Sequence, residues 1–307
     1  GASADYSGTP KKPYGTGTAV DPYQIGTVEE LYWFAEQVNG GEYGANAELT
    51  ANITINENVL NENGELNSGT FREWTPIGNN SNRYTGTFDG NDKTISGLYY
   101  DGSGNYVGLF GYVDSGSRVQ NVNVADSYIS VNVGDSVNVY VGGVCGYSSG
   151  TIMNCSFDGS VNGNGNGNGT CAGGVCGYNS GTIMNCYNTG TVKGSYYTGG
   201  VCGYNSGTIT NCRNTGSVTS SGNGSNYVGG VSGYNNRGTI TNCYNTGTVK
   251  GSYYTGGVCA DNIGMIMNCY NTGDVTGTGN VGGVCGGNNN RGTITNCRNT
   301  GSVTSSG

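Results

Sequence analysis

Residues 198–219 read TGGVCGYNSGTITNCRNTGSVT, and closely similar units precede and follow this stretch through most of the chain. When the Val of each GGV is taken as the register, successive units are spaced by roughly 26 to 31 residues. The spacing varies in one place, the linker between the last Val of a unit and the next GGV. Self-similarity at such a period is typical of repeat proteins, in which each unit stacks on its neighbours.

Each unit holds three short apolar stretches, GGVCG, TIxNC and TGxV, separated by Gly, Asn and Ser. Amphipathic helices are excluded because the stretches lack a 3.6-residue period and Gly is abundant. Three strands in about 26 residues predict one coil of an all-β parallel β-solenoid, whose coils stack at ~4.8 Å. A propeller or a sandwich is the alternative, but those folds use longer strands and less Gly.

The register predicts three interior columns of branched side chains. The first column is Leu109, Val144, Val175, Val201, Val231, Val258 and Val284. The second column is Val119, Ile152, Ile183, Ile209, Ile240, Ile266 and Ile294. The third column is Val161, Val192, Val218, Val249, Val275 and Val303. The Asn before each second Cys, such as Asn211, suits a left-handed corner, where its side chain can also bond to the next coil.

The first hundred residues follow a different pattern. Residues 27–30 (TVEE) form a capping box, and a single apolar stripe follows and ends at two glycines, Gly40 and Gly41. We therefore expect one helix of about eleven residues, within a small N-terminal cap that covers the open end of the solenoid. The stripe consists of Leu31, Phe34, Ala35 and Val38. The predicted divisions are a leader over 1–20, the cap and first irregular coils over 21–100, and about seven repeat coils over 101–307 of a longer array.

Composition and charge exclude several classes of function. The chain has 307 residues, 61 of them Gly, and no His, which removes the Ser-His-Asp triad and the commonest metal ligand. Its acidic excess lies in the first third and no basic stripe exists, so nucleic acid is a poor partner. No apolar run is long enough to span a membrane. We expect no catalytic residue, no metal and no cofactor, although a polysaccharide lyase or hydrolase on a β-helix remains an alternative.

Three motifs carry a resemblance to a known family: WTPIG at 74–78, GLFG at 108–111 and the repeated GGVCGYNSGTIxNCYNTGxV. With these motifs, roughly residues 20–307 resemble GLUG-motif proteins, which occur on bacterial surfaces and in the non-catalytic region of IgA-specific metallopeptidases. The resemblance implies a right-handed, single-stranded parallel β-helix and an adhesin-like role, and it transfers no catalytic residue. We therefore expect a secreted or bacterial cell-surface protein, and Ala2-Ser3-Ala4 resembles the end of a cleaved signal peptide.

The twelve cysteines allow two interpretations. Five units carry two Cys at matched places: Cys145/Cys155, Cys176/Cys186, Cys202/Cys212, Cys259/Cys269 and Cys285/Cys297. Disulfides within a coil are plausible in a secreted protein, whereas reduced Cys would serve as a small buried apolar residue. Ser232 replaces one member of a pair alone, and this favours reduced cysteines, because obligate partners should be lost together.

Tyrosine is the most suggestive residue type for binding. One shared position holds Tyr147, Tyr178, Tyr204 and Tyr234, and another holds Tyr187, Arg213, Tyr244, Tyr270 and Arg298. In a parallel column the second set would lie about 4.8 Å apart, close enough for Arg to stack on Tyr. We predict that this flat aromatic–cationic strip is a ligand-binding surface of a non-enzymatic adhesin, for a host or matrix glycan or protein.

A passive stalk that presents another domain is the competing prediction, in which tyrosine only covers the thin wall. Residues 185–202 recur letter for letter at 242–259, and residues 207–222 recur at 292–307. Such duplication lengthens a solenoid without refolding it, because each unit contacts only its neighbours. Length benefits an adhesin or a stalk more than an enzyme with one site.

Overall fold

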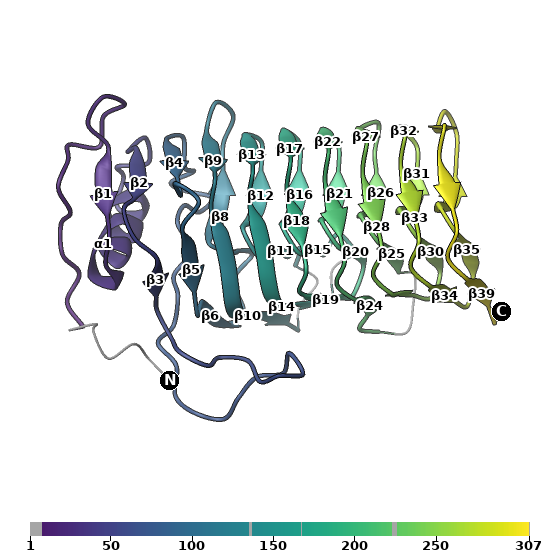
Figure 1. The fold of residues 1–307 in the computed structure, drawn as a ribbon, viewed down its shortest axis with the longest axis horizontal. Coiled ribbons are helices and arrows are strands. Elements are labelled where there is room, and N and C mark those ends of the chain that lie inside the picture. The colour runs from purple at the N-terminus through teal and green to yellow at the C-terminus, as the bar shows by residue number, and fades with distance from the viewer. Residues whose placement is uncertain (1–7, 135–136, 167, 223–225, 307) are drawn as a thin grey trace.

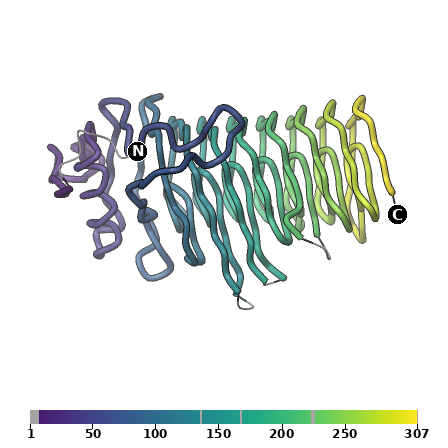
Figure 2. The backbone as a smooth tube through the Cα atoms, turned by 90° about the horizontal axis from the view of Figure 1, so that it is seen from below, coloured from purple at the N-terminus to yellow at the C-terminus, as the bar shows by residue number. Residues whose placement is uncertain are grey.

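The computed structural model describes residues 8–134, 137–166, 168–222 and 226–306, which form a parallel β-solenoid with a short helix near the N-terminus (Figure 1). The predicted fold class is therefore confirmed. Successive coils lie side by side along one axis, from the helical end to the last repeats (Figure 2). The segment at 2–4 that resembles the end of a signal peptide lies outside the described residues.

Within the described residues the strands form four sheets that run along the axis, and their pairings are parallel. Sheet 1 contains β1 (Tyr23–Ile25), β2 (Ala47–Leu49), β4 (Thr87–Asp89), β9 (Arg118–Gln120), β13 (Thr151–Met153), β17 (Thr182–Met184), β22 (Thr208–Thr210), β27 (Thr239–Thr241), β32 (Met265–Met267) and β37 (Thr293–Thr295). Sheet 2 contains β3 (Ile53–Thr54), β5 (Thr94–Ser96), β6 (Tyr99–Gly102), β10 (Asn123–Val133), β14 (Ser156–Gly165), β18 (Tyr187–Asn188), β19 (Thr191–Gly194), β23 (Arg213–Asn214), β24 (Val218–Ser220), β28 (Tyr244–Asn245), β29 (Val249–Lys250), β33 (Tyr270–Asn271), β34 (Val275–Gly277), β38 (Arg298–Asn299) and β39 (Val303–Ser305).

The other two sheets come from the repeats. Sheet 3 contains β7 (Tyr106–Val107), β11 (Tyr140–Gly142), β15 (Cys171–Gly173), β20 (Tyr197–Gly199), β25 (Tyr227–Gly229), β30 (Tyr254–Gly256) and β35 (Asn280–Gly282). Sheet 4 contains β8 (Phe110–Val113), β12 (Cys145–Ser148), β16 (Cys176–Asn179), β21 (Cys202–Asn205), β26 (Ser232–Asn235), β31 (Cys259–Asn262) and β36 (Cys285–Asn288). Each repeat coil therefore passes through sheets 3, 4, 1 and 2 in turn.

The prediction of three strands per unit is wrong in one respect, because the GGVCG stretch is divided between two sheets. In the coil that starts at β20, sheet 3 ends at Gly199 and sheet 4 begins at Cys202. The chain turns between them at Gly200, where a Cβ would lie 2.2 Å from the carbonyl oxygen of Gly230. Only a residue without a side chain fits this turn, so the second Gly of GGV separates two sheets.

The three predicted columns are present. The Val144 amide donates to the Val175 carbonyl at 3.0 Å, and the same contact recurs between later coils. In the second column Ile152 pairs with Ile183, and in the third Val161 pairs with Val192. These side chains are buried as far as the coil before the last, and the columns therefore form a continuous core along the axis.

The predicted left-handed Asn corners are also present. The Asn before each second Cys has a φ between 53° and 57°, a conformation that Asn adopts more readily than other side-chain-bearing residues. At two places the side chain also bonds to a neighbouring coil: Asn154 to Asn121 at 3.0 Å and Asn296 to Asn268 at 2.8 Å. This corner turns the chain from sheet 1 into sheet 2.

Two further Asn columns lie inside the solenoid, and they were not predicted. In one, Asn188 donates to Asn214, and the chain of side-chain bonds continues at 2.7–2.8 Å to Asn299. In the other, bonds of 2.8–3.0 Å run from Asn179 to Asn288. Each buried amide also bonds to a nearby Gly of its own coil, so its polar atoms are satisfied although it is removed from water.

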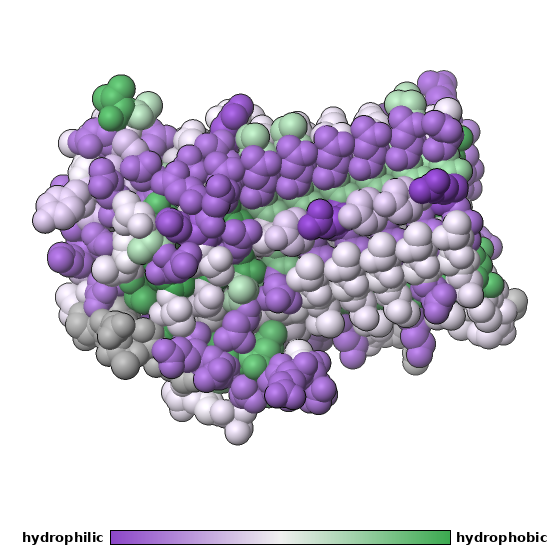
Figure 3. All heavy atoms as spheres, in the orientation of Figure 1, coloured by the Kyte–Doolittle hydropathy of each residue, from purple (hydrophilic) through white to green (hydrophobic). Residues whose placement is uncertain are grey.

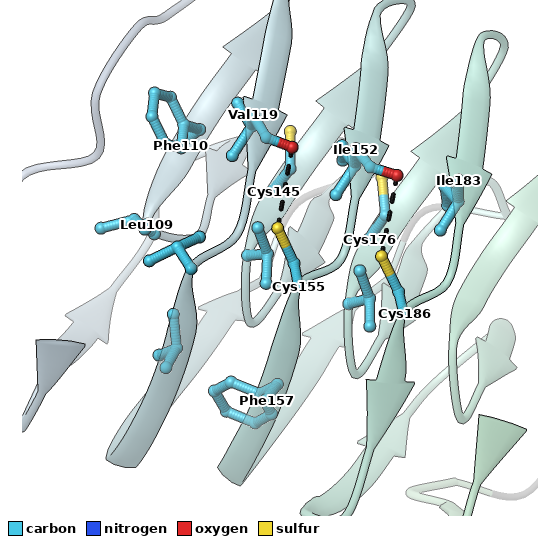
Figure 4. Packing of buried hydrophobic residues seen from close by; sticks show 14 of the residues in the cluster. Leu109, Phe110, Val119, Cys145, Ile152, Cys155, Phe157, Cys176, Ile183 and Cys186 are labelled. Atoms are coloured by element: carbon cyan, nitrogen blue, oxygen red, sulfur yellow. Dashed lines mark hydrogen bonds between the residues drawn. The ribbon is translucent and has the colours of Figure 1, made fainter. Parts of the chain in front are cut away.

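Eleven of the twelve cysteines form two interior columns, and the remaining one, Cys171, lies in sheet 3. Cys145, Cys176 and Cys202 are in register in sheet 4, and the other column follows the Asn corners. Most of the thiols bond to carbonyls: the Cys155 Sγ lies 3.7 Å from the Val119 oxygen (Figure 4), and the Cys176 Sγ lies 3.1 Å from that of Tyr178. All twelve cysteines lie within the described residues and all are free, in agreement with the interpretation of reduced, stacked Cys.

The N-terminal helix forms as expected. Helix α1 (Val28–Asn39) begins after Thr27, whose hydroxyl accepts a hydrogen bond from the Glu30 amide at 3.2 Å. The Glu30 carboxylate reaches back to the Gly26 amide at 3.0 Å, which completes the capping box. The predicted apolar stripe is buried against the first strands of sheet 1 (Figure 1).

The segment that follows β3 runs along the outside of the first coils before the chain enters β4 (Figure 2). The Asp126 carboxylate anchors it by accepting hydrogen bonds from the amides of Val59 and Leu60 at 3.1 and 2.9 Å. Further on, Ile77 forms a parallel bridge with Phe110. Residues 74–77 therefore contribute to the irregular first coils, and Thr87–Asp89 form β4 of sheet 1.

Candidate ligand-binding surface

The structure brings the five predicted strip residues together in one column of sheet 2. They occupy the first positions of β18, β23, β28, β33 and β38, and each is in register with the next. The preceding Asn corner directs the adjacent Cys and the following Asn inward, so the residue between them faces outward. The strip comprises Tyr187, Arg213, Tyr244, Tyr270 and Arg298.

The strip side chains stack on one another. The guanidinium carbon of Arg213 lies 4.2 Å from the Tyr187 ring centroid, and that of Arg298 lies 4.8 Å from the Tyr270 centroid. Tyr244 and Tyr270 are stacked with centroids 4.8 Å apart and planes 4° apart. Straight rows of side chains follow the axis in the space-filling view, and two strongly hydrophilic side chains interrupt one paler row (Figure 3). The binding role of the strip stays a prediction.

Stacking determines what the strip offers to a ligand. Because neighbouring side chains cover the ring faces, the ring edges, phenol hydroxyls and edges of the guanidinium groups are left to face outward. A guanidinium group carries five N–H donors in a planar fork, and stacking on a ring leaves its edge able to bind oxygen atoms. The strip is therefore better suited to hydrogen bonding with hydroxyl or carboxylate oxygens than to stacking of sugar rings on its tyrosines.

A second aromatic surface covers sheets 3 and 4. In sheet 4 the predicted Tyr column is stacked: the centroids of Tyr147 and Tyr178 are 4.5 Å apart, and those of Tyr178 and Tyr204 are 4.8 Å apart. A parallel column in sheet 3 packs edge-on against it, as Tyr140 does on Tyr147 at 5.2 Å. The sheet 3 column holds Tyr106, Tyr140, Tyr197, Tyr227 and Tyr254, with Cys171 in one coil.

The sheet 3 column was not predicted, because Tyr197 and Tyr254 follow directly on the linkers of variable length. They begin β20 and β30. The sequence signal for this column is a Tyr two residues before the first Gly of GGV, in YVG or YTG. Burial, together with neighbouring tyrosines, raises the pKa of Tyr204 and Tyr227 to about 12, so both stay neutral. Since these rings mainly cover one another, this surface is best explained as a wall of the solenoid.

A groove of about 700 Å³ lies beside the first coils, and the sequence did not indicate it. Its lining includes Trp74, Pro76, Tyr100 and Tyr106 together with several Asn side chains. The Trp74 indole N–H points at the Gly108 carbonyl at 3.2 Å, so this side chain belongs to the wall. Polar side chains, most of them Asn, make up much of the lining, and Glu73 is the one charged residue in it among those that the structure describes.

The described residues also bear on metal binding and on membrane insertion. In those parts of the chain, no three His, Cys, Asp or Glu side chains are placed to hold a metal ion together. No helix there is both long enough and apolar enough to cross a membrane.

Comparison with known proteins agrees with the repeat architecture. The family model of the GLUG motif matches the chain four times, at residues 137–162, 168–193, 194–219 and 224–250. Halomucin of Haloquadratum walsbyi is 34% identical over 157 residues, which cover 50% of this chain and 2% of halomucin. A protein of Evansella cellulosilytica described as a Gly-rich membrane protein is 36% identical over 86 residues, or 28% of this chain and 10% of that protein.

A solved structure shares the fold. The crystal structure of a Bacteroides ovatus protein described as an immunoglobulin A1 protease matches with a TM-score of 0.55 over 95% of this chain and 81% of that chain. At 20% identity the likeness concerns the fold alone. The chain spans only a small fraction of the two sequence relatives, so their names describe much longer proteins. The predicted resemblance is confirmed: residues 137–250 of this chain are a tandem array of GLUG motifs.

Proposed function

We propose that this chain is the repeat region of a non-enzymatic surface or secreted adhesin, which binds a host or matrix glycan or protein through the strip. The observation that carries the proposal is the stacking of Arg213 on Tyr187 and of Arg298 on Tyr270. The stacking holds each guanidinium in a fixed orientation with its donors outward. Binding of a partner therefore costs little further side-chain entropy of the arginines. A surface location is supported by the description of one relative as a Gly-rich membrane protein.

Repetition explains how weak contacts could suffice. The strip extends over five coils, and each coil adds a similar donor or hydroxyl at the same spacing along the axis. Linked weak contacts raise the overall affinity without a strong individual site. A non-enzymatic role is supported by the absence of His from the sequence and by the lack of a repeated acidic–basic pair.

The alternative function is a passive stalk, and the exact repetition of residues 185–202 at 242–259 favours it. In that case the strip tyrosines only shield the backbone. The two functions differ in whether the outward edges of the strip make contact with a partner.

A glycan array separates the two functions. Wild-type protein is compared with a triple variant, Tyr187→Ser, Tyr244→Ser and Tyr270→Ser, and we expect at least a tenfold loss of binding because the stack that orients both arginines is removed. The control is Tyr196→Ser with Tyr253→Ser, which removes tyrosines outside the strip. Circular dichroism establishes that both variants fold.

The outcomes are distinct. Binding that only the strip variant loses supports the adhesin. Wild-type protein that binds no glycan and no matrix protein, or binding that survives the triple change, leaves the stalk as the function. Shortening of pectin, alginate or glycosaminoglycan chains by pure protein would contradict the non-enzymatic part of the proposal.

A further inference from the structure

The corner between sheets 4 and 1 differs in length between coils. In most coils one residue separates the last Asn of sheet 4 from the Gly that opens the corner, as Ser206 separates Asn205 from Gly207. Two coils have longer corners, and both insertions end in Arg: Asn236-Arg237 in one coil and Asn289-Asn290-Arg291 in the other. The coil between them has a short corner, with Ile263 alone.

The alternation creates a notch on the outside of the solenoid. The two long corners are two coils apart, or about 10 Å, so they rise on either side of the short one. A cavity of about 560 Å³ lies there, lined by Arg237, Ile263, Asn290 and Arg291. Both arginines are exposed and Ile263 is half-buried, so the notch has two cationic walls and an apolar floor.

The arginines are not used by the fold. Within the described ranges, neither guanidinium has a hydrogen-bond or ion-pair partner. Arg237 also has a φ of 58°, a left-handed conformation that costs a non-Gly residue energy and that clusters at binding sites. Asp261, in the strand that precedes Ile263, accepts from the side-chain amide of Asn289 at 2.6 Å.

We infer that this notch binds an anionic group, the carboxylate or sulfate of an acidic polysaccharide. Two guanidinium forks can bind the oxygens of one such group from opposite sides, and the Asn290 amide can add a donor. The Ile263 side chain would lie under the carbon atoms of the sugar ring. An extended polymer is the suitable ligand because the notch is open and lies on the outer edge of a rod, where a long chain can pass across it.

The notch is independent of the strip. It lies at the end of sheet 1 that adjoins sheet 4, whereas the strip begins at the other end, where sheet 1 turns into sheet 2. Failure of either inference therefore leaves the other intact.

Calorimetric titration with three oligosaccharide probes tests the inference: a uronate oligomer, a sulfated glucan oligomer and the neutral glucan of equal length. We expect one or both charged probes to bind and the neutral one not to bind, with affinity falling as salt rises. The variant Arg237→Asn with Arg291→Gln should weaken binding at least tenfold. Asn is chosen at position 237 because it tolerates the left-handed backbone there.

Two controls complete the design. Lys193→Gln with Lys250→Gln removes the same charge from two exposed positions outside both the notch and the strip, and should leave binding within twofold of wild type. Arg237→Lys with Arg291→Lys keeps the charge, and should weaken binding less than the neutral pair does, because the bidentate geometry alone is lost. Absence of binding by both charged probes, equal binding of the neutral probe, or equal losses in the notch variant and the lysine control would overturn the inference.

Discussion

The cap and the repeats are stabilised in different ways. The cap core is made of aromatic side chains that occur once each: Phe34 of α1 packs against Tyr84 and Phe88, with ring centroids 6.1 and 5.9 Å apart. In the repeats, a core side chain instead packs against copies of itself in adjacent coils, as Ile183 does between Ile152 and Ile209. The cap therefore depends on unique contacts, whereas the repeats depend on a contact used many times.

The same difference explains the distribution of charge. In a column of identical residues any charge would face like charges at about 4.8 Å, which is destabilising. The repeats accordingly fill their columns with Asn, Thr, Tyr, Val and Cys, while the first hundred residues carry the whole acidic excess. In the strip each Arg is separated from the other by tyrosines, so the cations stack on rings and never on each other.

The largest expected effect is in the cap. Phe34 is fully buried among three aromatic rings, so Phe34→Ala should lower the free energy of unfolding by about 3–5 kcal/mol, since the cavity cannot be refilled. The matched change in the repeats is Val218→Ala, which removes less volume from a fully buried side chain and should cost about 1–2 kcal/mol. Denaturation by urea, followed by circular dichroism, measures both. Equal losses of unfolding free energy for the two variants would show that the cap core depends no more on a unique contact than one position of a repeat column does.

The repeated part of the fold could be predicted from the sequence because its pattern is local. A period, a Gly-rich turn and a branched residue at one register position determine which side chains stack, and the strip follows from the same register. The capping box of residues 27–30 and the stripe of α1 are equally local signals. The details that were missed depend on contacts across the coil, such as the Gly200 turn that divides one predicted strand between two sheets.

The buried Asn columns show why the rest was not predictable. Nothing in the residues next to Asn214 indicates that its amide points inward. Its place depends on Gly200 of the same coil, where a Cβ would lie 2.2 Å from the Asn214 side chain. The notch was missed for a similar reason: it needs two insertions in alternate coils, and a repeat alignment treats insertions as irregularities.

The second prediction concerns these columns. Asn214 accepts from Asn188 and donates to Asn245 and to the Gly216 carbonyl, each at 2.8 Å. Asn214→Ala removes these partners inside the core, so we expect a loss of about 2–3 kcal/mol in the free energy of unfolding. The control is Asn299→Ala, at an exposed rung, where water can replace the amide and the loss should stay below about 1 kcal/mol. Similar losses at both positions would mean that burial of the amide does not determine how much the Asn column contributes to stability.

The smallest effect is expected for Cys202→Ser. The Cys202 thiol is fully buried and bonds to the Tyr204 carbonyl at 3.2 Å, and burial raises its pKa well above the usual value, so it stays a protonated thiol. In the next coil Ser232 already occupies this position and donates to the Tyr234 carbonyl at 3.0 Å. A hydroxyl therefore fits the site, and the change should cost about 1 kcal/mol or less.

The magnitude of that loss distinguishes the two interpretations of the cysteines. If Cys202 were joined to Cys212, removing one sulfur would open the loop between them and cost about 2–4 kcal/mol. With free thiols, alkylation by iodoacetamide should modify the buried cysteines only after unfolding, without prior reduction, and mass spectrometry counts the labels. A large loss, together with a label count that rises on reduction, would show that the interior columns are cross-linked, and the repeats would then differ from the cap in covalent structure as well as in packing.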